Sequence, residues 1–185
     1  MNIKSVKNFH IEGPLLIESI GYRDIRGIFA ELYNYRSLIE HIDEIFIQDN
    51  ISFSKKNVIR GLHYQKSFPQ GKLIYCLRGC IFDVALDIRL GSPTFGQYIG
   101  VTLNSKYIQG FYIPPGFAHG FAVSSKSDAI VLYKCTRVYR SDYDSAISWK
   151  SADIKLPKDF IIEKEVYSKK DLAAPALTPE MGIIL

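Results

Sequence analysis

Residues Ile81–Arg89 read IFDVALDIR, and this stretch is the clearest strand pattern in the chain. Its even-numbered positions are all apolar, whereas Asp83, Asp87 and Arg89 occupy alternate positions. A period of two is the pattern of a β-strand with two unlike faces. Two acids on one face are costly to bury unless they are paired. We therefore expect the polar face either to meet water or to line a polar cavity.

Similar short apolar or alternating runs recur on both sides of this stretch, divided by Gly and Pro turn residues. Many short strands with such turns predict an all-β sandwich or barrel, and within that class we favour a double-sheet jelly roll. Only two short helices are expected, Ser37–Asp43 with Ser37 as its N-cap and a second near Ser168–Ala174. The expected strands are Leu15–Tyr22, Ile28–Tyr33, Ile45–Phe53, Val58–Tyr64, Lys72–Leu77, Ile81–Ile88, Gln97–Leu103, Phe111–Ile113, Phe117–Val123 and Ala129–Thr136.

The composition is that of an ordinary globular chain. Its 185 residues fit one domain, residues 1–185, and 47% of them are apolar. This balance excludes a disordered chain. Basic residues outnumber acidic ones 23 to 19, which gives a net charge of +4. The excess favours anionic ligands but is too small to indicate nucleic-acid binding.

No stretch has the character of a membrane span or a secretory signal. The longest uncharged run, Tyr107–Ser125, is broken by Gly and Pro residues and cannot form an apolar helix of about 20 residues. The first residues, MNIKSVKNFH, lack an apolar core after their lysines. The three cysteines are an odd number without Cys-x-x-Cys spacing, so we expect free thiols and a cytoplasmic location.

Two of the four histidines, His63 and His119, lie on or beside expected strands. Each could be a structural histidine held by hydrogen bonds. Metal-dependent jelly rolls offer a His-x-His pair, but here the corresponding residues are His63 and Gln65, and Gln is a poor ligand for a transition metal. No metal site is therefore expected, and His63 is free to transfer protons.

Three further side chains are open to two interpretations. Lys72 opens a strand after a Pro-Gln-Gly turn, and it is either a solvated surface residue or a cation that stabilises a developing oxyanion. Tyr133 and Tyr139 are either packing residues with a wet hydroxyl or, for a tyrosine that faces a cavity, general acids.

The chain resembles the dTDP-4-dehydrorhamnose 3,5-epimerases in stretches that follow in order from about Ile11 to Leu177, which makes the resemblance specific. The matching stretches are DIRGIFAE from Asp24, QDN from Gln48, VIRGLHYQ from Val58, PQGKL from Pro69, FDVALDIR from Phe82, SPTFG from Ser92, IPPGFAHGF from Ile113, LYKCT from Leu132 and SKKD from Ser168, with Pro175 and Leu177 beyond it.

The resemblance implies a metal-free, cofactor-independent jelly roll of the cupin superfamily that forms homodimers. Its substrate would be a nucleotide-diphosphate 4-keto-6-deoxy sugar, most simply dTDP-4-dehydro-6-deoxy-D-glucose, inverted at C3 and C5 on the way to L-rhamnose. The C4 ketone acidifies both C–H bonds because the resulting anion is delocalised onto the oxygen as an enolate. Inversion then needs a base on one face, a proton donor on the other and a cation beside the oxygen.

The resemblance also implies roles for single residues. His63 matches the base, Asp171 the carboxylate that orients it, Lys72 the enolate stabiliser and Tyr133 the opposite proton donor. Independently of the resemblance, Asp83 lies on the polar side of its strand and is therefore a second candidate for orienting a histidine. Arg26 and Arg60 match diphosphate ligands, and Tyr139 matches the residue that stacks on the nucleotide base. Glu31, Gln48, Asp49, Asn50, His119, Asp144 and Lys170 match further substrate contacts.

Some positions depart from the family pattern, and several functions stay open. Asp144 stands where Glu is usual, Ile51–Ser54 replaces a more polar stretch, Ile28 replaces a frequent aromatic, and Trp149–Pro157 lacks a second Trp. These changes affect the nucleotide side more than the reacting side. The alternatives are an epimerase that inverts one centre, an epimerase of a CDP-linked or other nucleotide sugar, a 4-keto sugar isomerase, and a non-catalytic sugar-nucleotide binder.

Overall fold

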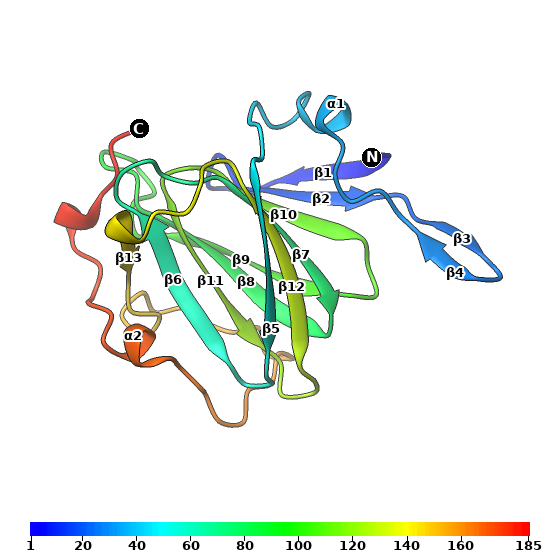
Figure 1. The fold of residues 1–185 in the computed structure, drawn as a ribbon. Helices are drawn as coiled ribbons and strands as arrows, with labels where there is room; N and C mark the ends of the chain where they lie inside the picture. The colour runs from blue at the N-terminus through cyan, green and yellow to red at the C-terminus, as the bar shows by residue number, and fades with distance from the viewer.

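The computed structural model describes residues 1–185, and two antiparallel sheets pack face to face in it (Figure 1). The six-stranded sheet has the order β1-β2-β10-β7-β12-β5, and the five-stranded sheet has the order β13-β6-β11-β8-β9. The predicted all-β, double-sheet jelly roll with a few short helices is confirmed. The strands are β1 Ile3–Asn8, β2 Leu15–Ser19, β3 Tyr22–Asp24, β4 Gly27–Phe29, β5 Gln48–Ser54, β6 Ile59–Gln65, β7 Lys72–Arg78, β8 Cys80–Asp87, β9 Tyr98–Asn104, β10 Gln109–Ile113, β11 Phe117–Val123, β12 Ala129–Cys135 and β13 Asp144–Ala146.

Every expected strand overlaps an observed one, but the ends differ and two strands were not expected. The run Leu15–Tyr22 is divided between β2 and β3, because the chain leaves the sheet to form a hairpin. Strands β1 and β13 were missed. β1 carries four polar residues among its six, and β13 has only three residues, so neither shows a clear period of two.

The helices are shorter than expected, and one N-cap prediction was wrong. Helix α1 spans Tyr35–Leu38, and its cap is Asn34, whose side-chain oxygen accepts a hydrogen bond from the Arg36 backbone N–H at 3.1 Å. Ser37 therefore lies inside the helix. Helix α2 spans Lys169–Leu172 and is capped by Ser168. Two 3-10 turns, η1 at Ser141–Tyr143 and η2 at Pro179–Met181, complete the short helical elements. None of these helices has the length and the apolar character that a membrane span requires.

Strand β8 is covered on both faces, which explains why its alternation does not mean exposure to water. Its odd-numbered apolar residues, Ile81 and Ala85, belong to the core between the two sheets. Its even-numbered residues join a second core, which Trp149, Phe160 and Ile183 of the C-terminal segment close from outside. A third core lies on the outer face of the six-stranded sheet under the α1 region. The acids of β8 must therefore be paired.

Asp87 is paired by a set of donors at one end of β8. Its side chain is 0% exposed and accepts hydrogen bonds from Arg89, Ser92 and Thr94 at distances of 2.6 to 3.0 Å. Burial raises the pKa of Asp87, but these donors outweigh it and hold the pKa at about 2. The group is a fixed anion that closes the loop between β8 and β9.

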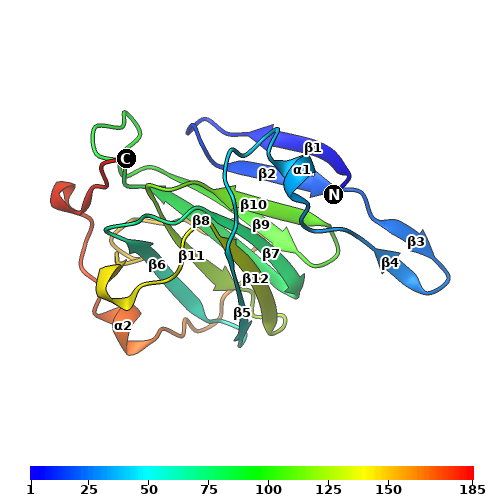
Figure 2. The same ribbon diagram turned by 45° about the horizontal axis from the view of Figure 1, so that its top comes forward.

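The β3–β4 hairpin forms a separate two-stranded ribbon that projects from the body in both ribbon views (Figures 1 and 2). All six residues of its strands are exposed. Its apolar side chains include Ile25 at the turn and Phe29, neither of which is covered within the chain. A hairpin this apolar and this open is typical of a contact surface.

Asp87 makes stability depend on pH in a defined window. Since its folded-state pKa lies below the unfolded value of 3.8, its contribution is complete above about pH 4 and is lost as the pH falls through about 2. Asp87→Asn should lower the free energy of unfolding at neutral pH by about 2 kcal/mol. Urea unfolding followed by circular dichroism at several pH values measures this difference.

The gap between wild type and Asp87→Asn should close as the pH falls from about 4 to about 2. Asp153→Asn, at an exposed site, is the matched control and should show no such gap. A gap that stays constant over this pH range would contradict the account.

Candidate active site

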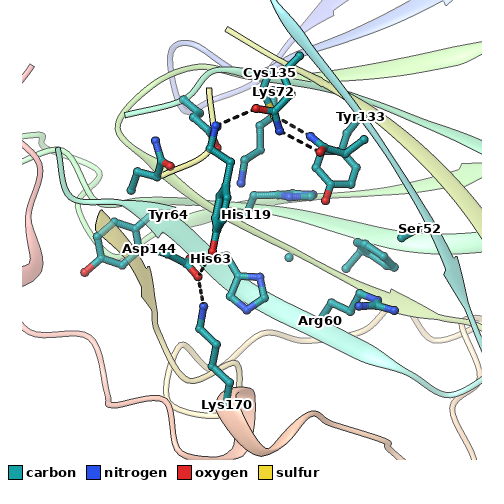
Figure 3. Close-up of a pocket in the computed structure, with 17 residues that line it drawn as sticks. Ser52, Arg60, His63, Tyr64, Lys72, His119, Tyr133, Cys135, Asp144 and Lys170 are labelled. Carbon is teal, nitrogen blue, oxygen red and sulfur yellow. Dashed lines mark hydrogen bonds and ion pairs between the residues drawn. The ribbon is translucent and has the colours of Figure 1, made fainter. Parts of the chain in front are cut away.

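A cavity of about 380 Å³ opens between the two sheets and receives side chains from both (Figure 3). Strand alternation sets its wall. Along β5, Gln48, Asn50 and Ser52 line the cavity, whereas the residues between them face outward. The five-stranded sheet contributes Arg60, His63 and His119, while the six-stranded sheet contributes Lys72, Tyr133 and Cys135.

A close approach of β6 to β11 brings the two histidines together. His63 and His119 are direct partners in the register of these strands. Gly61 adopts φ +104°, and a Cβ there would lie 2.6 Å from the His119 carbonyl oxygen. Only glycine permits both features. The glycine of the Arg-Gly-Leu-His stretch therefore allows β6 to approach β11 and to place His63 at the cavity.

His63 is held by a buried carboxylate. Its Nε2 lies 2.6 Å from Asp171 Oδ1, and Ser168 Oγ donates to the other carboxylate oxygen at 2.9 Å. Burial raises the pKa of Asp171, but the hydrogen bonds from His63 and Ser168 outweigh it, so the pKa is lowered. Because Nε2 is engaged and the His63 side chain is 34% exposed, Nδ1 is the nitrogen available to a ligand.

Lys72 and Tyr133 face this pair from the other sheet. Lys72 is only 9% exposed, and burial lowers its pKa, while Cys135, Asp83 and Asp144 raise it. Burial also raises the pKa of Tyr133, so the phenol keeps its proton at neutral pH. A cation and a proton donor thus lie across the cavity from a base.

The rim of the cavity carries a linked group of polar side chains. Asp144 Oδ2 accepts a hydrogen bond from Tyr139 Oη at 2.9 Å and also pairs with the Lys170 ammonium (Figure 3). The Tyr139 backbone N–H donates to Gln48 Oε1 at 2.8 Å. Arg60 donates from Nε to Ser54 Oγ at 2.9 Å and keeps the rest of its guanidinium for the cavity. The rim therefore has two cations and one carboxylate.

Most of the residues that the resemblance indicates come together here, although they are spread over the chain. Asp171 lies behind His63 rather than on the wall. The predicted residues that line the cavity are Gln48, Asn50, Arg60, His63, Lys72, His119, Tyr133, Tyr139, Asp144 and Lys170.

Three predicted substrate-binding residues do not line this cavity. Asp49 faces outward because its neighbours on β5 face inward, and its carboxylate pairs with Lys134 at 2.6 Å. Arg26 lies at the turn of the projecting hairpin, where it pairs with Asp24. Glu31 follows β4 and pairs with the N-terminal ammonium.

Other lining residues were not predicted. Two of them follow from strand alternation, since Ser52 is two positions from Asn50 and Cys135 is two positions from Tyr133. The rest, within motifs of the resemblance, carry no chemical signal of their own. The unpredicted lining residues are Ser52, Tyr64, Gln65, Gln70, Gly120, Phe121 and Cys135.

The arrangement suits proton transfer at a carbon next to a carbonyl group. A histidine held by a carboxylate can take a proton, a buried ammonium can stabilise the enolate oxygen, and a phenol can return a proton from the other side. No group of three or more His, Cys, Asp or Glu side chains is placed to hold a metal ion.

Known proteins with the same sequence pattern perform this type of reaction. A family profile described as dTDP-4-dehydrorhamnose 3,5-epimerase matches residues 8–179. A curated protein of that description from Salmonella typhimurium is 45% identical over 170 residues, which are 90% of this chain and 92% of that protein.

Solved structures agree in fold. A dTDP-6-deoxy-D-glucose-3,5-epimerase from Legionella pneumophila, in complex with dTDP-4-keto-L-rhamnose, has a TM-score of 0.90 at 41% identity and covers 98% of both chains. A 3'-monoepimerase from Streptomyces bikiniensis, in complex with dTDP-quinovose, has a TM-score of 0.81 at 29% identity and covers 91% of this chain and 85% of that one.

The cations of the cavity should bind inorganic pyrophosphate with an affinity that falls as salt is added. Arg60→Gln should weaken this binding about five- to tenfold, because the guanidinium offers a paired donor to phosphate oxygens. Isothermal titration at low and high salt measures the effect. Arg78→Gln, an exposed arginine at the end of β7 outside the cavity, is the control. Equal losses in both variants would contradict a specific anion site.

Proposed function

The chain belongs to the dTDP-4-dehydrorhamnose 3,5-epimerase family, and we propose that the cavity between its two sheets is the active site of this reaction. It is an isomerase that inverts C3 and C5 of a dTDP-linked 4-keto-6-deoxy hexose in dTDP-L-rhamnose biosynthesis. The roles of single residues are our proposal, and the position of His63 and Tyr133 on opposite sheets is the observation that carries it.

The proposed reaction proceeds through an enolate. Neutral His63 removes the proton from C5 or C3, and the electron pair of the C–H bond moves into the ring as the C4 oxygen gains negative charge. The Lys72 ammonium stabilises that oxygen, and Asp171 stabilises the imidazolium. Tyr133 then delivers a proton to the opposite face of the carbon, which inverts it. The imidazolium of His63 releases its proton to solvent, and Tyr133 regains one from solvent, so both groups are restored. These steps use only side chains of the protein.

The rim is proposed to bind the nucleotide part. Arg60 and Lys170 would hold the diphosphate, and the Tyr139 ring would offer a stacking surface for the base, which is worth about 1–3 kcal/mol. The complex of the Legionella pneumophila relative with dTDP-4-keto-L-rhamnose supports a dTDP-linked substrate. Asp144 would give up its contact with Lys170 when the diphosphate arrives.

We further propose that the protein works as a homodimer in which the hairpin of one copy completes the cavity of the other. Arg26 and Glu31 match substrate-binding positions, yet both lie outside this chain's own cavity. The hairpin exposes Ile25 and Phe29 to solvent in the single chain. A second copy that covers them would bring Arg26 to a diphosphate. We also propose a cytoplasmic location, which suits three free thiols.

His63→Asn and Tyr133→Phe should each slow epimerisation by about 10²- to 10⁴-fold, because each removes one proton-transfer group. Conversion of dTDP-4-dehydro-6-deoxy-D-glucose is followed by NMR in D₂O. The wild-type protein should place deuterium at both C3 and C5. Deuterium at one carbon would identify a single-centre epimerase, as in the Streptomyces bikiniensis relative, and none would refute the proposed function. Asp153→Asn is the control and should keep full activity.

The dimer proposal predicts complementation between two inactive variants. In a mixed dimer of Arg26→Ala and His63→Ala subunits, one cavity has both defects and the other has neither if the hairpin acts on its partner. Co-expressed subunits should therefore regain about a quarter of wild-type activity, because half of the dimers are mixed and each has one intact site. If Arg26 serves its own chain, no activity returns. Sedimentation measures the oligomeric state of each sample.

A further inference from the structure

Asp83 is a buried carboxylate, and one of its two oxygens has no hydrogen-bond partner. Its side chain is 0% exposed, and one oxygen, Oδ1, lies 2.8 Å from His119 Nε2. The other oxygen, Oδ2, is buried and has no hydrogen-bond partner. A carboxylate left with a free buried oxygen is costly, since transfer of an anion from water needs compensation.

Asp87 shows what a purely structural acid looks like on the same strand. It is equally buried, yet both of its oxygens accept hydrogen bonds from Arg89 and the Ser92–Thr94 loop. Asp83 has no such set of donors, although it lies on the same face of β8. Its negative charge therefore has a different use, and the side chains in front of it are those of the cavity.

Lys72 is a positive group that is buried in the cavity wall, and the charge of Asp83 acts on it. Its ammonium must keep a proton in order to stabilise an enolate, yet burial favours the neutral amine and lowers its pKa. Cys135, Asp83 and Asp144 oppose that effect. A compensating charge is thus required close to Lys72, and these three are its candidates.

Cys135 and Asp144 are weaker candidates than Asp83 for the charge that compensates the Lys72 ammonium. Burial raises the pKa of Cys135, so its thiol is neutral at physiological pH and adds no charge. Asp144 is already engaged by Lys170 and Tyr139 at the rim. Three further titratable side chains line the same cavity as Lys72, namely His63 from β6, His119 from β11 and Tyr133 from β12. Burial raises the pKa of Tyr133, so its phenol is neutral as well. Burial lowers the pKa of His119, which therefore stays neutral, and a positive His63 would only repel the ammonium.

We propose that Asp83 is a positioning residue that acts on the reaction through two neighbours. With Oδ1 it accepts the Nε2 proton of neutral His119 and so fixes the tautomer and orientation of that ring in the cavity. With the charge on its unpartnered side it maintains Lys72 as an ammonium. This inference rests on the proposed function, because it gives Lys72 its role at the enolate oxygen.

The test is the pH profile of Asp83→Asn, a variant of nearly the same shape without the charge. Turnover of the dTDP-linked substrate should keep its acid limb, while its alkaline limb moves down by about one pH unit or more, as expected when a nearby opposite charge is lost. Lys72→Arg, which cannot deprotonate, should remove the alkaline limb in either background and so identifies the group. Asp87→Asn is the matched control, since it loses a buried acid of the same strand outside the cavity.

A purely structural role for Asp83 would lower the melting temperature in both Asn variants and leave both alkaline limbs in place, and that result would overturn the inference. If Asp83→Asn does not fold, the wild-type protein still decides the question. The ¹³C shift of the Lys72 side chain, assigned with Lys72→Met, should show an ammonium throughout the active pH range. A neutral amine in that range would also refute the inference. If the wild-type protein shows no deuterium exchange into the substrate, the proposed function is refuted instead.

Discussion

The space between the two sheets is closed to water on most sides, so a polar side chain that points into it needs a partner. Each strand with a period of two sends every second residue into this space, and the outer faces are covered as well by the C-terminal segment and the α1 region. Most inward residues are apolar and form the central core. At one end the inward residues are polar instead, and that end is the cavity.

In the cavity, pairs of a histidine and a carboxylate compensate the free-energy cost of burying polar side chains. Asp171 and Asp83 each serve one histidine, at 2.6 Å and 2.8 Å, from different parts of the chain. The two pairs differ in exposure, since His63 is open to a ligand whereas His119 is buried. One pair can therefore exchange protons with a substrate while the other stays fixed. The cavity thus has a reactive side and a rigid side.

Much of the fold and of the candidate site could be predicted from sequence patterns, because the alternation of strand residues governs both. The run Ile81–Arg89 indicated a strand whose polar face either meets water or lines a polar cavity. It could not tell that Asp87 closes a loop while Asp83 meets a histidine, because those partners lie elsewhere in the sequence. The sequence around α1 likewise did not show that Asn34 rather than Ser37 is the N-cap. The start of this helix depends on where the chain leaves the hairpin.

The proposed catalytic and substrate-binding residues were indicated by the family resemblance and not by spacing alone. The structure separates two of the proposed binding residues from the rest, since Arg26 lies in the projecting hairpin, Glu31 follows it, and neither lines the cavity of its own chain. No local pattern predicts such a separation, because it depends on how the hairpin leaves the body of the fold. Asp49 is different, since alternation along β5 would have placed it outside.

In the proposed reaction the base and the proton donor reach the sugar from opposite sheets. Tyr133→Phe in D₂O tests this arrangement, with NMR following both deuterium content and configuration at C3 and C5. We expect the variant to exchange hydrogen for deuterium with retention of configuration, because His63 removes and returns the proton on one face. Inversion at a wild-type rate, or loss of exchange together with inversion, would contradict it.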